Sequence, residues 1–160
     1  MKYLALFIVP LLFLAACGTQ DSSDNVLKAN GPTVIGQESG SYGQVIATNF
    51  YRYNKEGYEK AKTEGKAIFL ESYATWCPIC KAENPDILAA FNEFNNDNVI
   101  GFRIHFNDNE VNDEDLEISK EFGITYQHTK IIIDKTGNEV LKTLEVFDKE
   151  RTLEEFNKVI

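Results

Sequence analysis

The sequence predicts an α/β domain in which helices flank a mixed β-sheet. Strand-like and helix-like stretches alternate from about residue 44 onward, and segment 66–73 contains a continuous apolar run bounded by polar residues. Such a run is typical of a strand that is buried on both faces. The order of the elements therefore indicates a mixed sheet sandwiched between helices.

Caps and periodicity predict the individual elements. Asn54, Asn112 and Asp148 have the side chains preferred at helix N-caps, and a glycine follows the helices that begin at Asn54 and Asn112. Strands are expected where apolar residues alternate with polar ones or run together, and a polar turn over 134–138 makes the last two strands a hairpin. The expected strands are 44–51, 66–73, 98–106, 131–133 and 139–146, and the expected helices are 54–64, 78–95, 112–122 and 148–160.

Helical spacing predicts which side chains face the core. Pro85 is expected to kink the second helix. In strand 98–106, Arg103 and His105 lie on the face opposite the apolar one. The second helix carries an apolar stripe of Ile87, Leu88, Phe91 and Phe94, and the last helix is expected to point Leu153, Phe156 and Ile160 inward.

Composition and charge exclude several classes of protein. The chain carries 16 Lys+Arg against 25 Asp+Glu, a net charge of −9, which argues against a nucleic-acid partner. With 43% hydrophobic residues it can build one core of ordinary size, so we expect a single folded domain and a monomer. The acidic run 107–115 lacks the glycine that an EF-hand loop needs. No phosphate-binding loop or serine-nucleophile motif is present in the sequence.

The N-terminus has the pattern of a secretory signal peptide. Lys2 precedes an apolar run over 3–16 that is too short to cross a hydrocarbon core of about 30 Å as a helix. The run closes with Leu-Ala-Ala-Cys-Gly at 14–18, which resembles a bacterial lipobox, where cleavage precedes a lipidated cysteine. We therefore expect a signal peptide over 1–16 and a lipid anchor on Cys17. An ordinary signal peptide or an uncleaved anchor is the alternative.

A flexible tether is expected to follow the anchor. Residues 17–43 are rich in small polar residues and lack hydrophobic periodicity. The folded domain is expected over 44–160, and an extra strand at 33–35 is the alternative within the tether. Together with the anchor, this places the domain in the cell envelope, outside the cytoplasm and on a membrane.

Two of the three cysteines carry the predicted chemistry. Cys77 and Cys80 are separated by two residues where a buried strand gives way to a helix. The N-terminus of a helix favours a thiolate, the form that attacks disulfides, and Cys80 can reach back one turn to close an exchangeable disulfide. We therefore assign Cys77 as the nucleophile and Cys80 as the shielded resolving thiol. A structural disulfide and a metal site are the alternatives, although His105 and His128 are the only histidines and their spacing matches no zinc finger.

The segment 71–81, which contains Trp-Cys-Pro-Ile-Cys-Lys, resembles the strand-to-active-site segment of the thioredoxin-like superfamily. The resemblance extends over about 44–160. Trp76 matches the tryptophan of the family motif, and Pro85 matches the proline that kinks the active-site helix. The resemblance implies a thioredoxin-like fold and thiol–disulfide oxidoreductase activity on protein disulfides without a cofactor. Trp76 and Pro78 are expected to bind substrate or to tune the cysteines.

The resemblance also implies roles for two charged residues. Glu71 falls where many family members carry a buried acid, which would accept the proton of Cys80. This is chemically sensible, because desolvation favours the protonated form of a carboxyl group. Arg103 falls where the family often has a lysine near that acid, and it would favour the carboxylate. The alternatives are a solvent-facing Glu71 and a solvated Arg103.

His128 marks a departure from the family. It stands before Thr129, where thioredoxin-like proteins usually have a cis-proline. A cis bond without proline costs several kcal/mol, so we predict a trans peptide between Gln127 and His128. A protonated His128 opposite Cys77 would stabilise the thiolate and make the cysteine pair more oxidising. The alternatives are an ordinary surface histidine and metal capture by the two cysteines with His128.

The sequence therefore predicts a lipid-anchored thiol–disulfide oxidoreductase that reduces protein disulfides outside the cytoplasm. The segment 50–81 resembles the C-terminal thioredoxin-like domains of transmembrane reductant conductors, which favours the reducing direction. A membrane-embedded thiol donor would then have to reduce the cysteine pair after each cycle. The alternatives are a disulfide oxidase or isomerase, and a non-catalytic lipoprotein that holds a metal or a client.

Overall fold

The computed structural model describes residues 39–160. Its strands are β1 (Ser39–Gly40), β2 (Gly43–Ala47), β3 (Phe50–Arg52), β4 (Ala67–Tyr73), β5 (Val99–His105), β6 (Lys130–Ile133) and β7 (Glu139–Thr143). Its helices are α1 (Lys55–Thr63), α2 (Pro78–Phe94), α3 (Asp113–Glu121) and α4 (Lys149–Val159).

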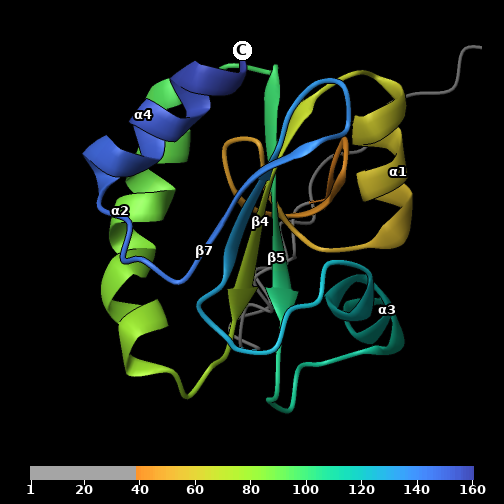
Figure 1. The fold of residues 1–160 in the computed structure, drawn as a ribbon, viewed down its shortest axis with the longest axis vertical. Coiled ribbons are helices and arrows are strands. Elements are labelled where there is room, and N and C mark those ends of the chain that lie inside the picture. The colour runs from red at the N-terminus through yellow and green to blue at the C-terminus, as the bar shows by residue number, and fades with distance from the viewer. Residues whose placement is uncertain (1–38) are drawn as a thin grey trace, which may run out of the picture. The chain divides into compact units, whose positions relative to one another are not determined.

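The described strands form one mixed sheet in the order β1-β2-β3-β5-β4-β6-β7. The central strand β4 runs parallel to β5 and antiparallel to β6. Figure 1 shows α2 and α4 on one face of this sheet and α1 and α3 on the other. The predicted fold class, a mixed sheet flanked by helices, is therefore confirmed.

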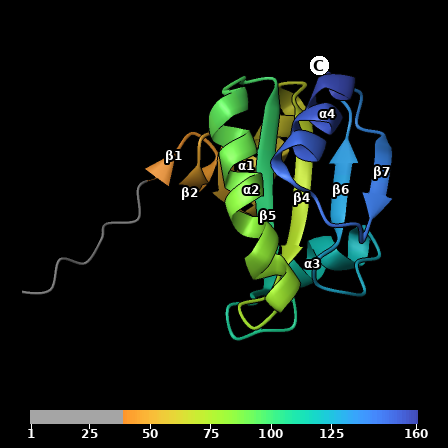
Figure 2. The same ribbon diagram turned by 90° about the vertical axis from the view of Figure 1, so that its left-hand side faces the viewer.

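The core has two layers because β4 is buried on both faces, as predicted. Ile68 and Leu70 belong to the cluster beneath α1 and α3. Phe69 belongs to the cluster beneath α2 and α4, where it meets Phe91 and Phe156 edge to face. Figure 2 shows β4, β5, β6 and β7 side by side beyond α2 and α4. The C-terminal end of β4, at Tyr73, leads through a short segment into the start of α2 at Pro78.

The N-terminal part of the sheet differs from the single strand expected over 44–51. β2 and β3 are two antiparallel strands with a register shift between Val45 and Ala47, and Asn49 turns the chain between them with φ of 55°. Asparagine tolerates this left-handed conformation better than most residues, so the apolar stretch reverses direction here. Ordered structure also includes 39–43, which was expected to belong to the tether.

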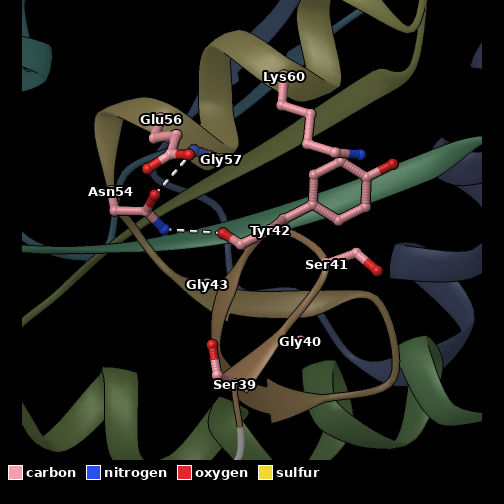
Figure 3. Close-up of a pocket in the computed structure, with 9 residues that line it drawn as sticks. All are labelled: Ser39, Gly40, Ser41, Tyr42, Gly43, Asn54, Glu56, Gly57 and Lys60. Carbon is pink, nitrogen blue, oxygen red and sulfur yellow. Dashed lines mark hydrogen bonds between the residues drawn. The ribbon is translucent and has the colours of Figure 1, made fainter.

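Asn54 joins this hairpin to α1. Its side-chain oxygen accepts the Gly57 N–H at 2.7 Å, as expected of an N-cap, and its Nδ2 donates to the Tyr42 carbonyl at 2.8 Å (Figure 3). Gly57 leaves room for this contact, because a Cβ there would lie 2.0 Å from the Tyr42 oxygen. Asn112 and Asp148 also cap their helices as predicted.

Two predictions at the C-terminal end are wrong. The strand expected over 139–146 ends at Thr143, because the main chain beyond it turns to bind buried charged side chains: Lys130 donates to the Glu145 carbonyl, and the Phe147 N–H donates to Glu83. Ile160 follows the last residue of α4 and is exposed rather than turned inward.

Candidate active site

The cysteine pair lies at the junction between β4 and α2. Cys77 is the N-cap residue of α2, and Pro78 occupies the first turn, where the absence of an N–H costs nothing. The Sγ of Cys77 accepts the Cys80 N–H at 3.2 Å. The first cysteine therefore stands at a helix N-terminus, as predicted, where the free N–H groups and the helix dipole favour a thiolate.

The two cysteines are joined by a disulfide, with a Cα–Cα distance of 5.3 Å. Their exposed fractions are 3% for Cys77 and 1% for Cys80, so the expected shielding of Cys80 is confirmed and Cys77 is also largely covered. Trp76 and Ile79 beside them are about half exposed, at 49% and 50%. The pair is thus set in a surface of exposed apolar side chains.

A loop after β5 holds the segment that leads into the cysteines. The Thr75 N–H donates to Oδ2 of Asp108 at 2.8 Å, and the Trp76 indole N–H donates to the Asn107 carbonyl at 2.8 Å. Asp108 also lies 3.0 Å from the His105 ring. The acidic run that could have suggested calcium therefore positions the active-site segment instead.

Glu71 and Arg103 form a buried ion pair beneath this segment. They are register partners on β4 and β5, and Arg103 Nε donates to Glu71 Oε2 at 2.8 Å. Arg103 also donates to the side chain of Asn84 on α2 and lies over the Tyr73 ring at 4.3 Å. The alternatives of a solvent-facing Glu71 and a solvated Arg103 are therefore excluded.

A second buried ion pair was not predicted. Glu83 on α2 and Lys130 on β6 are both buried, and Lys130 Nζ lies 2.5 Å from Glu83 Oε1. Glu83 could have been found from helical spacing, because Cys80, Glu83 and Ile87 share the inward face. Lys130 carried no such signal, since a lysine that begins an apolar strand usually points toward solvent.

Burial shifts the pKa values of both Glu83 and Lys130. It raises the pKa of Glu83, and this effect is opposed by Lys130 and by the Phe147 N–H. Burial lowers the pKa of Lys130, and this effect is opposed by the carboxylates of Glu83 and Glu71. Each charge therefore depends on its partner.

Comparison with known proteins agrees with this geometry. No family model matches the chain. A thiol-disulfide oxidoreductase, ResA, of Halalkalibacterium halodurans is 27% identical over 132 residues, which cover 71% of this chain and 74% of the relative. Among solved structures, the DsbH oxidoreductase superimposes with a TM-score of 0.56 at 17% identity, covering 86% of this chain and 94% of that structure. Thioredoxin f from spinach chloroplast superimposes with a TM-score of 0.54 at 21% identity, covering 72% of this chain and 97% of that structure.

The chain has a thioredoxin-like fold. This confirms the fold that the sequence resemblance implied. In the described part of this thioredoxin-like chain, no helix is long and apolar enough to span a membrane. Cys17, the expected signal peptide and the part of the expected tether up to residue 38 lie outside the described residues.

The thioredoxin-like domain departs from the expectation for His128. The residue has φ of 73°, its N–H donates to the Ser72 carbonyl at 2.6 Å, and its side chain is buried rather than on the surface. Burial and the nearby Lys130 lower the pKa of His128 to about 4, so the ring is neutral at neutral pH. A protonated His128 is therefore disfavoured at neutral pH, because it would place a second cation beside Lys130 inside the protein.

The neutral ring of His128 contacts the second ion pair. Its Nδ1 lies 3.0 Å from Glu83 Oε1 and 3.1 Å from Lys130 Nζ. Within residues 39–160, no three histidine, cysteine or acidic side chains are grouped as metal ligands. The Nδ1 atom of His128, the residue expected to be the third ligand if the two cysteines held a metal, is therefore already in contact with Glu83 and Lys130.

Proposed function

We propose that this chain is a thiol–disulfide oxidoreductase that reduces protein disulfides outside the cytoplasm. The observation that carries the proposal is the disulfide between Cys77 and Cys80, with Cys77 at the N-terminus of α2. A strand-to-helix junction of this kind stabilises one thiolate and leaves its partner one turn away. The similarity to an oxidoreductase and the thioredoxin-like fold support it.

The reaction begins with the reduced pair. The Cys77 thiolate attacks a client disulfide, a Cys77–client bond forms, and the first client thiolate leaves. Cys80 then loses its proton and attacks Cys77 Sγ, which re-forms the Cys77–Cys80 bond and releases the second client thiolate. The client thiolates take up two protons, one that Cys80 gave up and one from solvent. Two electrons and two protons thus pass to the client.

A buried carboxylate receives the proton of Cys80 in this scheme. Glu71 is proposed as the acceptor: Arg103 occupies its Oε2, and its buried Oε1 has no hydrogen-bond partner among the described residues. Glu83 is a second acid for the same step, because residues three apart on a helix bring their Cβ atoms within about 5–6 Å. Both acids lie where water is scarce, which suits a carboxyl that must gain and lose a proton.

The exposed side chains beside the cysteines suit a protein client. Trp76 and Ile79 offer apolar contact area on either side of Cys77, and the main chain of Asn107 holds the indole in place. We propose that clients dock on this surface. A dithiol donor, which we propose to be embedded in the membrane, reduces the Cys77–Cys80 bond again, and lipid on Cys17 keeps the domain near that donor.

The neutral state of His128 favours the reducing direction over the oxidising one. A protonated His128 beside the Cys77 thiolate would favour a disulfide oxidase or isomerase. With a pKa of about 4, the ring supplies no positive charge at neutral pH. Its place beside Glu83 and Lys130 also weakens the alternative of metal held by the two cysteines and His128.

Trapping of clients tests the proposal. A Cys80→Ser variant can form the Cys77–client bond but cannot resolve it, so we expect mixed disulfides on non-reducing gels, and Cys77→Ser is the matched control that forms none. The reduction potential of the pair then gives the direction: about −230 mV or lower supports a reductase, and above about −180 mV supports an oxidase or isomerase. Absence of exchange by the unmodified chain would overturn the proposal.

A further inference from the structure

Lys130 is a fully buried lysine in the first position of β6. Its side chain is 0% exposed. The ammonium lies 2.5 Å from Glu83 Oε1 and 3.1 Å from His128 Nδ1, and it donates to the Glu145 carbonyl at 2.9 Å. It also lies 5.5 Å from the centre of the Phe147 ring. The Lys130 ammonium therefore contacts residues from α2, from the turn before β6 and from the segment after β7.

Through these contacts Lys130 connects α2 to the segment before β6 and to the segment after β7. Glu83 belongs to the helix that begins at the cysteines, and its Oε2 accepts the Phe147 N–H at 3.2 Å. His128 belongs to the turn that enters β6, and its N–H bonds to β4 at Ser72. The same ammonium therefore holds the active-site helix against the turn at His128.

Lys130 also lies between the two buried acids. Glu71 is its register partner across the β4–β6 pairing, and Glu83 faces it from α2. Arg103 on β5 neutralises Glu71, and Arg151 on α4 lies against the Phe147 ring at 5.4 Å. Lys130 is thus the only one of these cations within ion-pair distance of Glu83 among the residues described.

We propose that Lys130 is a positioning residue for thiol–disulfide exchange, whose buried ammonium keeps Glu83 as a carboxylate one helical turn from Cys80 and holds the His128 ring beside it. The inference rests on the proposed function and extends it to a residue outside the cysteine motif. Without the ammonium, Glu83 would be a buried acid whose remaining neighbours are the neutral His128 ring, the Phe147 N–H and the negative Glu71. Such an acid holds its proton.

The ionisation of Glu83 matters for the resolving step. A carboxylate near Cys80 can accept the thiol proton, so that the S–H bond breaks as an O–H bond forms and the thiolate attacks Cys77. A protonated Glu83 cannot accept this proton. Loss of the Lys130 charge should therefore slow the attack by Cys80 at pH values where the unmodified chain is active, and a higher pH should restore it.

The first test measures the charge of Glu83 itself, without any redox reaction. Carboxyl-carbon NMR of the oxidised chain follows the Glu83 signal with pH, and Glu83→Gln assigns that signal. In Lys130→Met we expect the titration midpoint of Glu83 to rise by about one pH unit or more. Lys130→Arg should stay near the unmodified chain, and Lys135→Met, which removes an exposed lysine in the β6–β7 turn, should not change the midpoint.

The second test measures exchange. The reduced chain reacts with an aromatic disulfide whose coloured thiolate is released once on attack by Cys77 and again on attack by Cys80. We expect Lys130→Met to leave the first release nearly unchanged and to slow the second release at pH values below the raised Glu83 midpoint, by up to about tenfold per unit of midpoint shift. Because Lys130→Met could unfold, Glu83→Gln/Lys130→Met, which leaves no unpaired buried charge, is measured alongside.

The outcomes separate the inference from the proposed function. An unchanged Glu83 midpoint, or an unchanged second release in a folded Lys130→Met variant, overturns the role of Lys130 while exchange by the unmodified chain still stands. If the unmodified chain releases no thiolate at any pH, the proposed function fails and the role of Lys130 in exchange fails with it. A raised midpoint with a slowed second release supports both.

Discussion

Arg103 donates from Nε to Oε2 of Glu71 across 2.8 Å, and both side chains lie inside the protein on neighbouring parallel strands. Each charge makes the other tolerable in the interior, because an isolated buried ion is far more costly than a paired one. The second pair, Glu83 with Lys130, repeats this arrangement between α2 and β6. Two acids and two cations therefore lie beneath the cysteine segment, and their stability effects can be measured.

Arg103→Met should destabilise the protein strongly. The substitution leaves Glu71 buried without its ion-pair partner and removes the contact with Asn84. We expect a loss of about 3–5 kcal/mol in the free energy of unfolding, measured by urea denaturation at neutral pH. Glu71→Gln/Arg103→Met should recover part of this loss. A single variant that loses less than about 1 kcal/mol would show that the pair is not coupled in solution.

His128 should make stability depend on pH between about 4 and 6.5. Burial, with the charge of Lys130, lowers the pKa of His128 from 6.5 to about 4, so the unfolded chain binds a proton in this window and the folded chain does not. The free energy of unfolding therefore falls as the pH drops from 6.5 toward 4, by up to about 3 kcal/mol from this residue.

The comparison with His128→Gln isolates this contribution. Acidic groups such as Asp108, whose pKa is lowered by hydrogen bonds from Thr75 and Glu110 although burial opposes the shift, also destabilise the protein at low pH. The slope of unfolding free energy against pH should be shallower in His128→Gln than in the unmodified chain. Equal slopes would mean that His128 is exposed or charged in the folded protein.

Asn54 should contribute to the free energy of unfolding through two separable hydrogen bonds. Its oxygen caps α1 at Gly57, and its Nδ2 holds the Tyr42 carbonyl (Figure 3). Asn54→Ala removes both bonds and should cost about 2 kcal/mol in urea unfolding. Asn54→Asp keeps the cap and loses only the donor, so about half of that loss is expected. If the two variants lose the same amount, the bond to Tyr42 is the dominant contribution.

Asp108 should hold the active-site tryptophan in place. Asp108→Ala removes the acceptor of the Thr75 N–H, next to Trp76, and should cost about 1–3 kcal/mol in unfolding free energy. Trp76 is the one tryptophan of the sequence, so its fluorescence reports this site directly. We expect emission at longer wavelength and stronger quenching by iodide in Asp108→Ala, and no change in the exposed control Asp86→Ala.

Most of the fold was predictable because its signals are local. The caps at Asn54, Asn112 and Asp148 and the apolar run in β4 depend on residues that are neighbours in the chain. The hairpin of β2 and β3 was missed because a short apolar stretch looks the same whether it continues or reverses. The early end of β7 was missed because its cause, Lys130, is distant in sequence from Glu145.

The sequence by itself determined the cysteine pair at the start of a helix, because spacing and residue type carry this information, and its resemblance to the thioredoxin-like superfamily indicated an acid at Glu71 and a basic residue at Arg103. Only the tertiary structure decided that Glu83 and Lys130 form a second buried pair and that His128 is neutral beside them. The physical reason is that ionisation depends on burial and on charges brought together from α2, β4 and β6. Folding sets those distances, and no local pattern encodes them.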